Sequence, residues 1–412
     1  MSHVRFVKMV LALTAVLSLL SVGASGSTFK VIYKFTGGQD GANPVDAGAL
    51  AIDGNGNLYG TTVLGGACGE GTVFQLSPNG SGGWTETVMH SFCGPDGNGP
   101  TGGLQIYGPY LLGTTPYGGA FGTGTSFVAG TDGSFSTDFA DFNCSGGFGC
   151  LPYVGLGNDT FGVIPNYLGG INGAGALIDP ASALAGYEFC SLAACADGAN
   201  PASLPVADSQ QNAYGTTHLG GVNNLGVVYA FASSCCAGYS VLHSFAGGTN
   251  DGASPFFATL TLTEACAVGG LCSQTIWGTT PLGGAGAAHG GAGYGTVFAI
   301  PTFSPYYLVH SFNRLDGAYP YAGLTNLNGA FYGTTSGGGF LRSTCCPPRF
   351  QLGRGTIYSL TQNGTLTTLH TFAGPDGASP YSGLVADSSG NLYGVTFFGG
   401  AYNAGVVYEI TP

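Results

Sequence analysis

Histidine and aspartate recur together along this sequence, and such pairs are common in acid–base catalysis. Each of four histidines is followed six or eight residues later by an aspartate. A catalytic residue needs one special environment, whereas a pair repeated in four units is typical of a buried hydrogen bond that ties a strand to a loop. We therefore interpret these pairs as structural: His90 and Asp96, His243 and Asp251, His310 and Asp316, His370 and Asp376.

Residues outside the repeated pattern are better candidates for a functional site. His218 and His289 each follow a repeated segment without recurring themselves, and an ordinary exposed loop position is the alternative for both. Arg342, Arg349 and Arg354 lie in one insertion of an otherwise acidic chain. Guanidinium groups suit carboxylate and sulfate recognition, so an anionic polysaccharide is a candidate ligand. The alternative is a solvated loop whose cations balance nearby acids.

Several aromatic residues in predicted loops are candidates for stacking on sugars, although they would also fill gaps between sheets. No nucleophile elbow or zinc-protease motif is present, and no carboxylate pair for glycoside hydrolysis can be identified. The acids lack the spacing of a calcium loop, so we expect no metal and no cofactor. The aromatic candidates are Tyr117, Phe121, Tyr167, Phe397, Phe398 and Tyr402.

Composition excludes several classes of protein. The chain has 412 residues, of which 77 are glycine, 44% are hydrophobic and only 7% are charged. So many hydrophobic residues argue against disorder, and so much glycine argues against a helical bundle. The formal net charge of -12 argues against a nucleic-acid partner. A glycine-rich globular protein built mainly of strands remains.

The first 26 residues have the features of a secretory signal peptide. Arg5 and Lys8 form a short basic segment, an apolar run covers residues 9–22, and small residues at 23–26 supply a cleavage site. The apolar run is near the short limit for spanning a bilayer, so a membrane anchor is the alternative. We expect a secreted or cell-surface protein with no membrane span after cleavage, and a single domain over residues 27–412.

Twelve cysteines follow this segment, an even number that suits disulfides in an oxidising compartment. Their spacing suggests local cross-links, and no two pairs have the spacing of a zinc ribbon or finger. Two pairs are adjacent in sequence, and these either form vicinal disulfides or bond elsewhere. The candidate pairs are Cys68 with Cys93, Cys144 with Cys150, Cys190 with Cys195, Cys266 with Cys272, Cys235 with Cys236, and Cys345 with Cys346.

Internal repetition is the strongest signal in the chain. Gly-Thr-Thr triplets or degenerate forms of them recur seven times, at spacings of 53, 49, 53, 63, 55 and 61 residues, which is the size of a propeller blade. Around each triplet lie four short apolar runs separated by turn residues, including an Asp-Gly-Ala-x-Pro turn between units. The triplet glycines are Gly60, Gly113, Gly162, Gly215, Gly278, Gly333 and Gly394.

Four strands in each of seven units predict an all-β fold, a seven-bladed β-propeller of four-stranded blades. The chain begins with an unmatched strand over residues 29–35, and its last unit lacks an outer strand. We therefore expect the N-terminal strand to close the last blade. A β-solenoid is the alternative, although its coils are normally much shorter than this period.

The repeated strings resemble the glycine-rich GloVer tandem repeat of exported bacterial proteins. The matching strings are LYGTT at residues 58–62, AYGTT at 213–217, FYGTT at 331–335, and GTVF at 71–74 and 295–298. Repeat three departs most, because residues 161–164 replace the triplet and the Asp-Gly turn is missing. The resemblance implies export and a propeller-like fold, and it implies no established reaction.

The sequence thus predicts a secreted, non-catalytic binding or scaffolding propeller, with no nucleic-acid partner and no membrane span after signal removal. We expect a monomer whose partner is an extracellular polysaccharide or a surface protein. One alternative is an extracellular polysaccharide lyase or hydrolase that uses the top face, with His218 or His289 as the base. Another is a structural surface-layer component. Propellers host many activities, so the fold does not decide between them.

Overall fold

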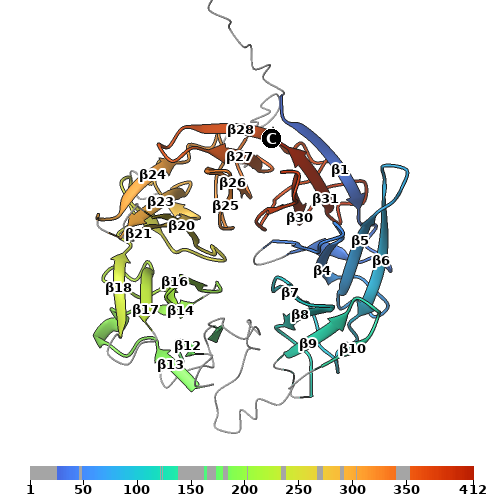
Figure 1. Ribbon diagram of the computed structural model, residues 1–412, viewed down its shortest axis with the longest axis horizontal. Coiled ribbons are helices and arrows are strands. Elements are labelled where there is room, and N and C mark those ends of the chain that lie inside the picture. Colours follow the sequence, from blue (N-terminus) through green and yellow to red (C-terminus); the bar gives the residue numbers. More distant parts are fainter. Residues whose placement is uncertain are drawn as a thin grey trace, which may run out of the picture.

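The computed structural model describes residues 26–45, 49–120, 122, 124–137, 162–164, 173–179, 184–201, 203–232, 238–266, 272–287, 292–302, 304–339 and 353–412. Short antiparallel sheets follow one another around a ring (Figure 1). Among these residues the one helical element is a single 3-10 turn, η1 (Ala193–Cys195). The predicted all-β propeller arrangement is confirmed.

Six blades have four strands from the inside of the ring to the outside, and we number each blade by its repeat. In blades one and four, two short strands share the innermost position. Blade one has β2 (Ala42–Pro44), β3 (Ala51–Ile52), β4 (Leu58–Leu64), β5 (Thr72–Pro78) and β6 (Trp84–Ser91); blade two has β7 (Gln105–Tyr107), β8 (Tyr110–Thr115), β9 (Thr125–Gly130) and β10 (Phe135–Ser136); blade four has β14 (Ala199–Pro201), β15 (Val206–Ala207), β16 (Asn212–Leu219), β17 (Val227–Ala232) and β18 (Tyr239–Ser244).

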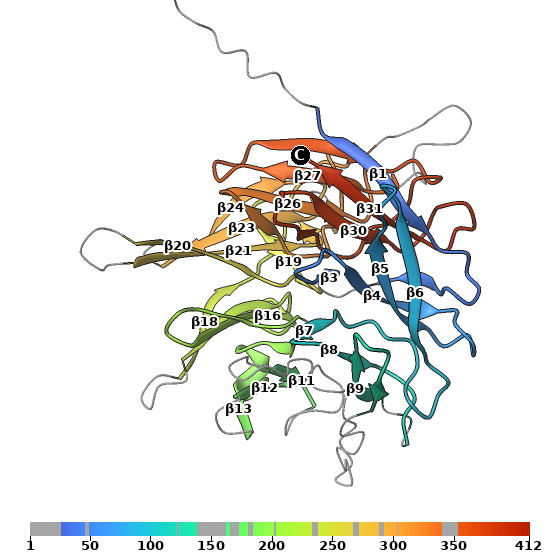
Figure 2. The same ribbon diagram turned by 45° about the vertical axis from the view of Figure 1, so that its right-hand side comes forward.

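The other three complete blades lie in the second half of the ring. Blade five contains a long inner hairpin, β20 with β21, which projects from the ring in Figure 2. Blade five has β20 (Thr261–Cys266), β21 (Cys272–Thr280), β23 (Thr296–Pro301) and β24 (Tyr307–Ser311), with β19 (Gly252–Ala253) paired to β22 (Leu282–Gly283) beside it; blade six has β25 (Thr325–Leu327), β26 (Ala330–Thr335), β27 (Thr356–Leu360) and β28 (Leu366–Thr371); blade seven has β29 (Val385–Ala386), β30 (Leu392–Thr396), β31 (Val406–Thr411) and β1 (Thr28–Lys34).

The prediction of seven four-stranded blades is wrong at repeat three. There the described residues form a three-stranded sheet, β11 (Gly162–Ile164), β12 (Ala176–Asp179) and β13 (Leu184–Glu188). Val163 and Ile164 stand where five of the other repeats have two threonines and repeat seven has Val395 and Thr396. This repeat therefore lacks the hydroxyl groups that hold a triplet strand to its neighbours in the other blades.

Threonine hydroxyls explain why the triplet strands form so regularly. The second threonine bonds within its own blade, as in Thr62, whose Oγ1 lies 2.8 Å from Thr72 Oγ1. The first reaches the next blade, as in Thr279, which donates to the Ala322 carbonyl at 2.7 Å. Both kinds of threonine are buried, so each satisfied hydroxyl also removes the penalty of an unpaired polar group.

Aromatic rings fill the space between neighbouring blades. In six of the blades a phenylalanine directly after the outer strand packs on a ring in the third strand of the following sheet, as Phe245 does on Phe298 at a centroid distance of 5.4 Å. Both of these side chains are fully buried. Equivalent pairs are Phe35 with Phe74, Phe92 with Phe127, Phe189 with Tyr229, Phe312 with Tyr358, and Phe372 with Tyr408.

The two ends of the described chain meet in blade seven. Strand β1 pairs antiparallel with β31 from Thr28 opposite Thr411 to Lys34 opposite Val406. Figure 1 shows β1 as the outermost strand of this blade, next to blade one. The ring is therefore closed by the N-terminal strand, as the sequence predicted.

Candidate functional site

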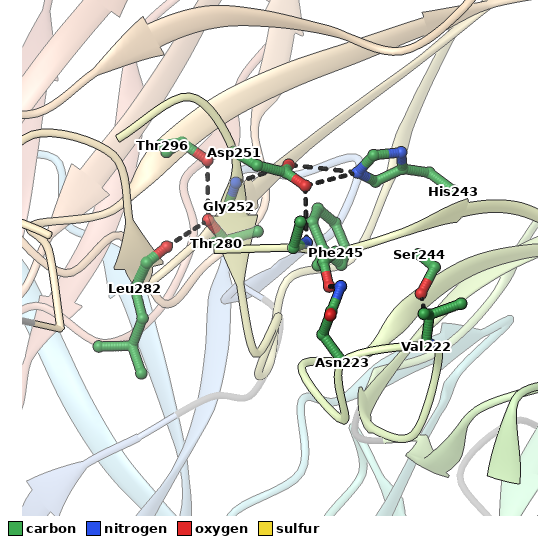
Figure 3. A network of polar contacts seen from close by, with 11 residues as sticks. Val222, Asn223, His243, Ser244, Phe245, Asp251, Gly252, Thr280, Leu282 and Thr296 are labelled. Carbon is green, nitrogen blue, oxygen red and sulfur yellow. Dashed lines mark hydrogen bonds and ion pairs between the residues drawn. The ribbon is translucent and has the colours of Figure 1, made fainter. Parts of the chain in front are cut away.

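The recurring histidine–aspartate pairs are bonded in all four blades. The distances from His Nε2 to the nearer Asp oxygen are 2.6 Å, 3.1 Å, 3.0 Å and 2.9 Å along the chain. Figure 3 shows the pair of His243 with Asp251, whose carboxylate also accepts from the Ala246 N–H at 2.7 Å. Burial alone would raise the pKa of Asp251, but the hydrogen bonds from His243 and Ala246 outweigh it and hold the pKa below its usual value. The pairs tie strand to loop, which confirms the structural interpretation.

A ring from the following blade covers most of these side chains. Phe135 stacks on His90 at a centroid distance of 3.4 Å, and Tyr306 stacks on His243 at 3.8 Å. Tyrosine replaces histidine in two units, where Tyr187 donates to Asp197 at 2.7 Å. Its ring is covered by Tyr239 at 3.7 Å. A side chain covered in this way is held in place by packing, and it cannot present both ring faces to a substrate.

The contact that closes the ring departs from this pattern. Glu86 stands four residues before its histidine, where Tyr239, Tyr306 and Phe29 stand in other blades. It faces Tyr33, which donates to Asp40 at 3.1 Å. Burial and the nearby Asp40 carboxylate raise the pKa of Glu86 to about 7. Two carboxyl groups therefore meet where other blades have stacked rings.

Replacement of Glu86 by glutamine is expected to change how stability depends on pH. Because the pKa is about 7 when folded and 4.5 ordinarily, the folded wild type binds more protons between these values and loses stability as the pH rises through them. Glutamine does not titrate, so the variant does not lose stability in this way as the pH rises. Because solvent screens a half-buried group, we expect the free energy of unfolding of Glu86→Gln to exceed that of the wild type by about 1 kcal/mol above pH 7 and to equal it near pH 4.5.

Urea unfolding of both proteins from pH 4.5 to 8 measures this difference. The matched control is Glu264→Gln, which changes an exposed carboxylate on β20. A constant difference between wild type and Glu86→Gln across the range would contradict the expectation.

Two of the predicted disulfides are present in the described part of the chain. Cys68 bonds Cys93, and Cys190 bonds Cys195. Both pairings are those expected from the spacing. Cys144, Cys150, Cys235, Cys236, Cys345 and Cys346 lie outside the described residues, and the side chains of Cys266 and Cys272 are likewise not described.

The unrepeated histidines do not form a site together. His289 lies outside the described residues, whereas His218 is half-buried near the end of β16, with its ring 4.9 Å from that of Phe256. Its Nδ1 is buried without a hydrogen-bond partner, and burial lowers the pKa of the ring despite a hydrogen bond with the Ser254 backbone. Burial thus disfavours the charged form of this imidazole, which packs on the ring of Phe256.

Of the three arginines in the insertion, the structure describes one. Arg342 and Arg349 lie outside the described residues. Arg354 lies directly before β27 and is exposed. It lines a cavity of about 670 Å³ that the loops of blades five, six and seven enclose. This cavity, which we call the rim cavity, is the candidate functional site.

Aromatic and hydrogen-bonding side chains line the rim cavity. Its polar or aromatic residues are Tyr319, Tyr321, Ser336, Arg354, Ser379, Tyr381, Phe398 and Asn403. The rings of Tyr321 and Tyr381 meet edge to face at 5.4 Å, and that of Tyr381 meets Phe397 at 5.8 Å. These contacts fix the orientation of the rings, and Phe398 remains 40% exposed. The cavity thus has rigid apolar faces beside several hydrogen-bonding groups.

Three lining residues have backbones in the left-handed region: Asn403, a residue type that adopts it readily, and the turn residues Tyr319 and Ser379. The φ angle is 60° at Tyr319 and 54° at Ser379. At the same position of the turn, other units have Asn43, Gly99 and Asn200, which adopt positive φ more readily. A tyrosine in this conformation costs about 1 kcal/mol. Strain of this kind is often retained where a side chain serves a function.

Sequence reasoning found only part of the rim cavity. It singled out Arg354 and Phe398, but it missed the tyrosines that follow the Asp-Gly-Ala turns. A usable signal was present, because residues 321 and 381 are tyrosine where repeats one and two have Val45 and Thr101. Of the other predicted aromatics, Tyr117 and Tyr402 are 64% and 65% exposed outside the cavity lining, and Phe121 and Tyr167 lie outside the described residues.

The described lining of the rim cavity contains tyrosine and arginine as its titratable residues. No aspartate, glutamate or histidine of the described chain lines the rim cavity. Nor does any group of three histidine, cysteine, aspartate or glutamate residues, within the same described ranges, have the placement to hold a metal ion. No helix of the described segments is long and apolar enough to cross a membrane.

Residues 157–344 match the family model described as the Gloeobacter/Verrucomicrobia repeat, which confirms the resemblance to GloVer over that segment. No curated protein matches the chain significantly. Solved structures similar to it include the N-terminal domain of Nup159, with 11% identity and a TM-score of 0.45, covering 94% of this chain and 96% of that chain. The RS223 β-xylosidase has 10% identity and a TM-score of 0.33, covering 81% of this chain and 97% of that chain. The Bacteroides ovatus xyloglucan PUL GH43B has 12% identity and a TM-score of 0.32, covering 91% of this chain and 57% of that chain. At these TM-scores the likenesses carry no implication for function.

Proposed function

We propose that this chain, whose residues 157–344 match the Gloeobacter/Verrucomicrobia repeat, is an exported, non-catalytic protein that binds an extracellular polysaccharide in the rim cavity. The observation that carries the proposal is the cavity lining, which combines aromatic side chains with hydrogen-bonding groups. Sugars present apolar C–H faces and polar hydroxyl edges, and binding sites are typically concave with a few placed polar groups.

Geometry at the cavity supports rigid recognition. Tyr381 contacts Tyr321 on one side and Phe397 on the other, so its ring loses little conformational entropy on binding. The hydroxyl groups of Tyr319, Tyr321, Tyr381 and Ser379 supply both donors and acceptors. Such a lining favours a ligand with many hydroxyl groups.

Export is the second part of the proposal. Cross-links such as Cys68–Cys93 persist mainly in oxidising compartments, and the N-terminal segment has the composition of a signal peptide. A secreted protein with a glycan-binding cavity would meet polysaccharide outside the cell.

Replacement of Tyr319 by glycine is expected to weaken polysaccharide binding at least about tenfold, because one aromatic wall of the cavity is lost. Stability should fall by no more than about 1 kcal/mol, since relief of the left-handed backbone offsets the lost contacts. Affinity electrophoresis against a panel of soluble polysaccharides, with thermal unfolding alongside, measures both quantities.

Ser254→Gly is the matched control, because Ser254 has φ 52° at the equivalent turn position but does not line the cavity. This control should bind as the wild type does. Equal binding by wild type and Tyr319→Gly would place the ligand elsewhere. Release of new reducing ends or unsaturated products from a bound polymer would overturn the non-catalytic part of the proposal.

A further inference from the structure

Arg354 is the one charged residue that lines the rim cavity within the described chain. The protein as a whole has 20 acidic residues against 8 basic ones. No acid within 4 Å neutralises this guanidinium among the described residues, where the ion pairs are the four histidine–aspartate pairs. The cavity is therefore locally positive in an acidic molecule.

The propeller scaffold does not require arginine at this position. What the repeats share here is a backbone contact, in which the carbonyl accepts a hydrogen bond from the turn of the next blade: Ser379 N to Arg354 O and Tyr319 N to Tyr294 O, both at 2.8 Å. The side chain varies freely among the repeats. The equivalent residues are Glu70, Thr123, Ala174, Leu225, Tyr294 and Ala404.

Space for the guanidinium comes from a neighbouring glycine. The Arg354 side chain lies against Gly374, where a Cβ atom would collide with Nη1. Gly374 has φ 108°, a conformation that side chains rarely adopt, so this turn keeps the space open. The absence of a side chain at position 374 therefore leaves room for the guanidinium of Arg354, a lining residue of the cavity.

We infer that the ligand of the rim cavity is a polysaccharide whose sugars carry carboxylates, with one carboxylate bound by Arg354. The inference rests on the proposed function and narrows its ligand class. A guanidinium presents parallel N–H donors that match the two oxygens of a carboxylate. Densely sulfated polymers are less suitable, because no second lysine or arginine of the described chain lines the cavity and the acidic protein repels additional charge.

Matched polymers test this inference without any mutation. Polygalacturonate, alginate and hyaluronate are each compared with their carboxyl-reduced forms, which keep the chain but lose the charge, and dextran sulfate supplies the sulfate arm. We expect the wild type to bind at least one native polymer about tenfold more tightly than its reduced form, as a charge-assisted hydrogen bond implies. Arg354→Gln should bind both forms equally, with the affinity of the wild type for the reduced form.

The outcomes separate the inference from the proposed function. If the wild type binds native and reduced polymers equally, or prefers the sulfated one, the carboxylate inference is overturned while polysaccharide binding stands. If it binds none of these polymers and no neutral one, both fail. Circular dichroism and the unchanged affinity for the reduced polymer show that Arg354→Gln remains folded.

Discussion

Deletion of β1 is expected to destabilise the protein by at least about 5 kcal/mol. A chain that begins at residue 37 loses Phe35, which is fully buried on Phe74, and Phe29, whose ring stacks on His370 at 3.6 Å. Burial of each large apolar side chain contributes about 1.5–3 kcal/mol. The deletion also leaves β31 as an unpaired edge, which promotes aggregation.

Thermal and urea unfolding of the truncated protein measure this effect. A chain that begins at residue 27 is the control, because it lacks the signal segment but keeps β1. Addition of a peptide of residues 27–36 should restore part of the lost stability by occupying the vacated edge. An unchanged transition in the truncated protein would show that β1 does not hold the ring closed.

Substitution of Gly60 by alanine is the second change with a large expected effect, a loss of about 3 kcal/mol. A Cβ at this position would lie 2.6 Å from Phe74 Cζ and 2.7 Å from Leu50 Cδ2. Both neighbours are buried, and β4 is paired on either side by β3 and β5, so neither ring nor strand has room to move. Overpacking of a filled core typically costs about 1–3 kcal/mol.

Gly54→Ala is the matched control, since a Cβ at Gly54 meets nothing within 4 Å and no positive φ is required there. We expect its free energy of unfolding to equal or slightly exceed that of the wild type. Equal urea midpoints for Gly60→Ala and Gly54→Ala would show that the close approach of Phe74 to β4 is not needed for stability.

Repeated and variable residues have separate tasks in this protein. The paired His243 and Asp251, like their equivalents, hold each blade to its own loop. The rim cavity instead uses positions where the repeats differ, such as Tyr319 and Arg354. Loops on a rigid scaffold tolerate such variation because they carry little of the packing. A substitution at the rim is therefore expected to alter binding more than stability.

Much of the fold could be predicted from local patterns that recur. The triplet strands, the Asp-Gly-Ala turns and the structural role of His90 with Asp96 were all apparent, because a repeated unit must satisfy the same hydrogen bonds in each blade. Closure of blade seven by β1 could be predicted because the first strand is unmatched and the last repeat lacks an outer strand. The prediction of four strands per blade is wrong at repeat three, where Val163 and Ile164 replace threonine and the described residues form three strands.

The sequence alone determined the strand order, the turn positions and the presence of an arginine in a variable segment, since each depends on residues close together in the chain. Only the tertiary structure showed that Tyr319, Tyr381, Phe398 and Arg354 enclose one cavity. These residues come from different repeats, and they meet because the turn that enters one blade packs against the loop of the blade before it. Contacts of that kind depend on how the blades are oriented around the ring, which no local pattern specifies.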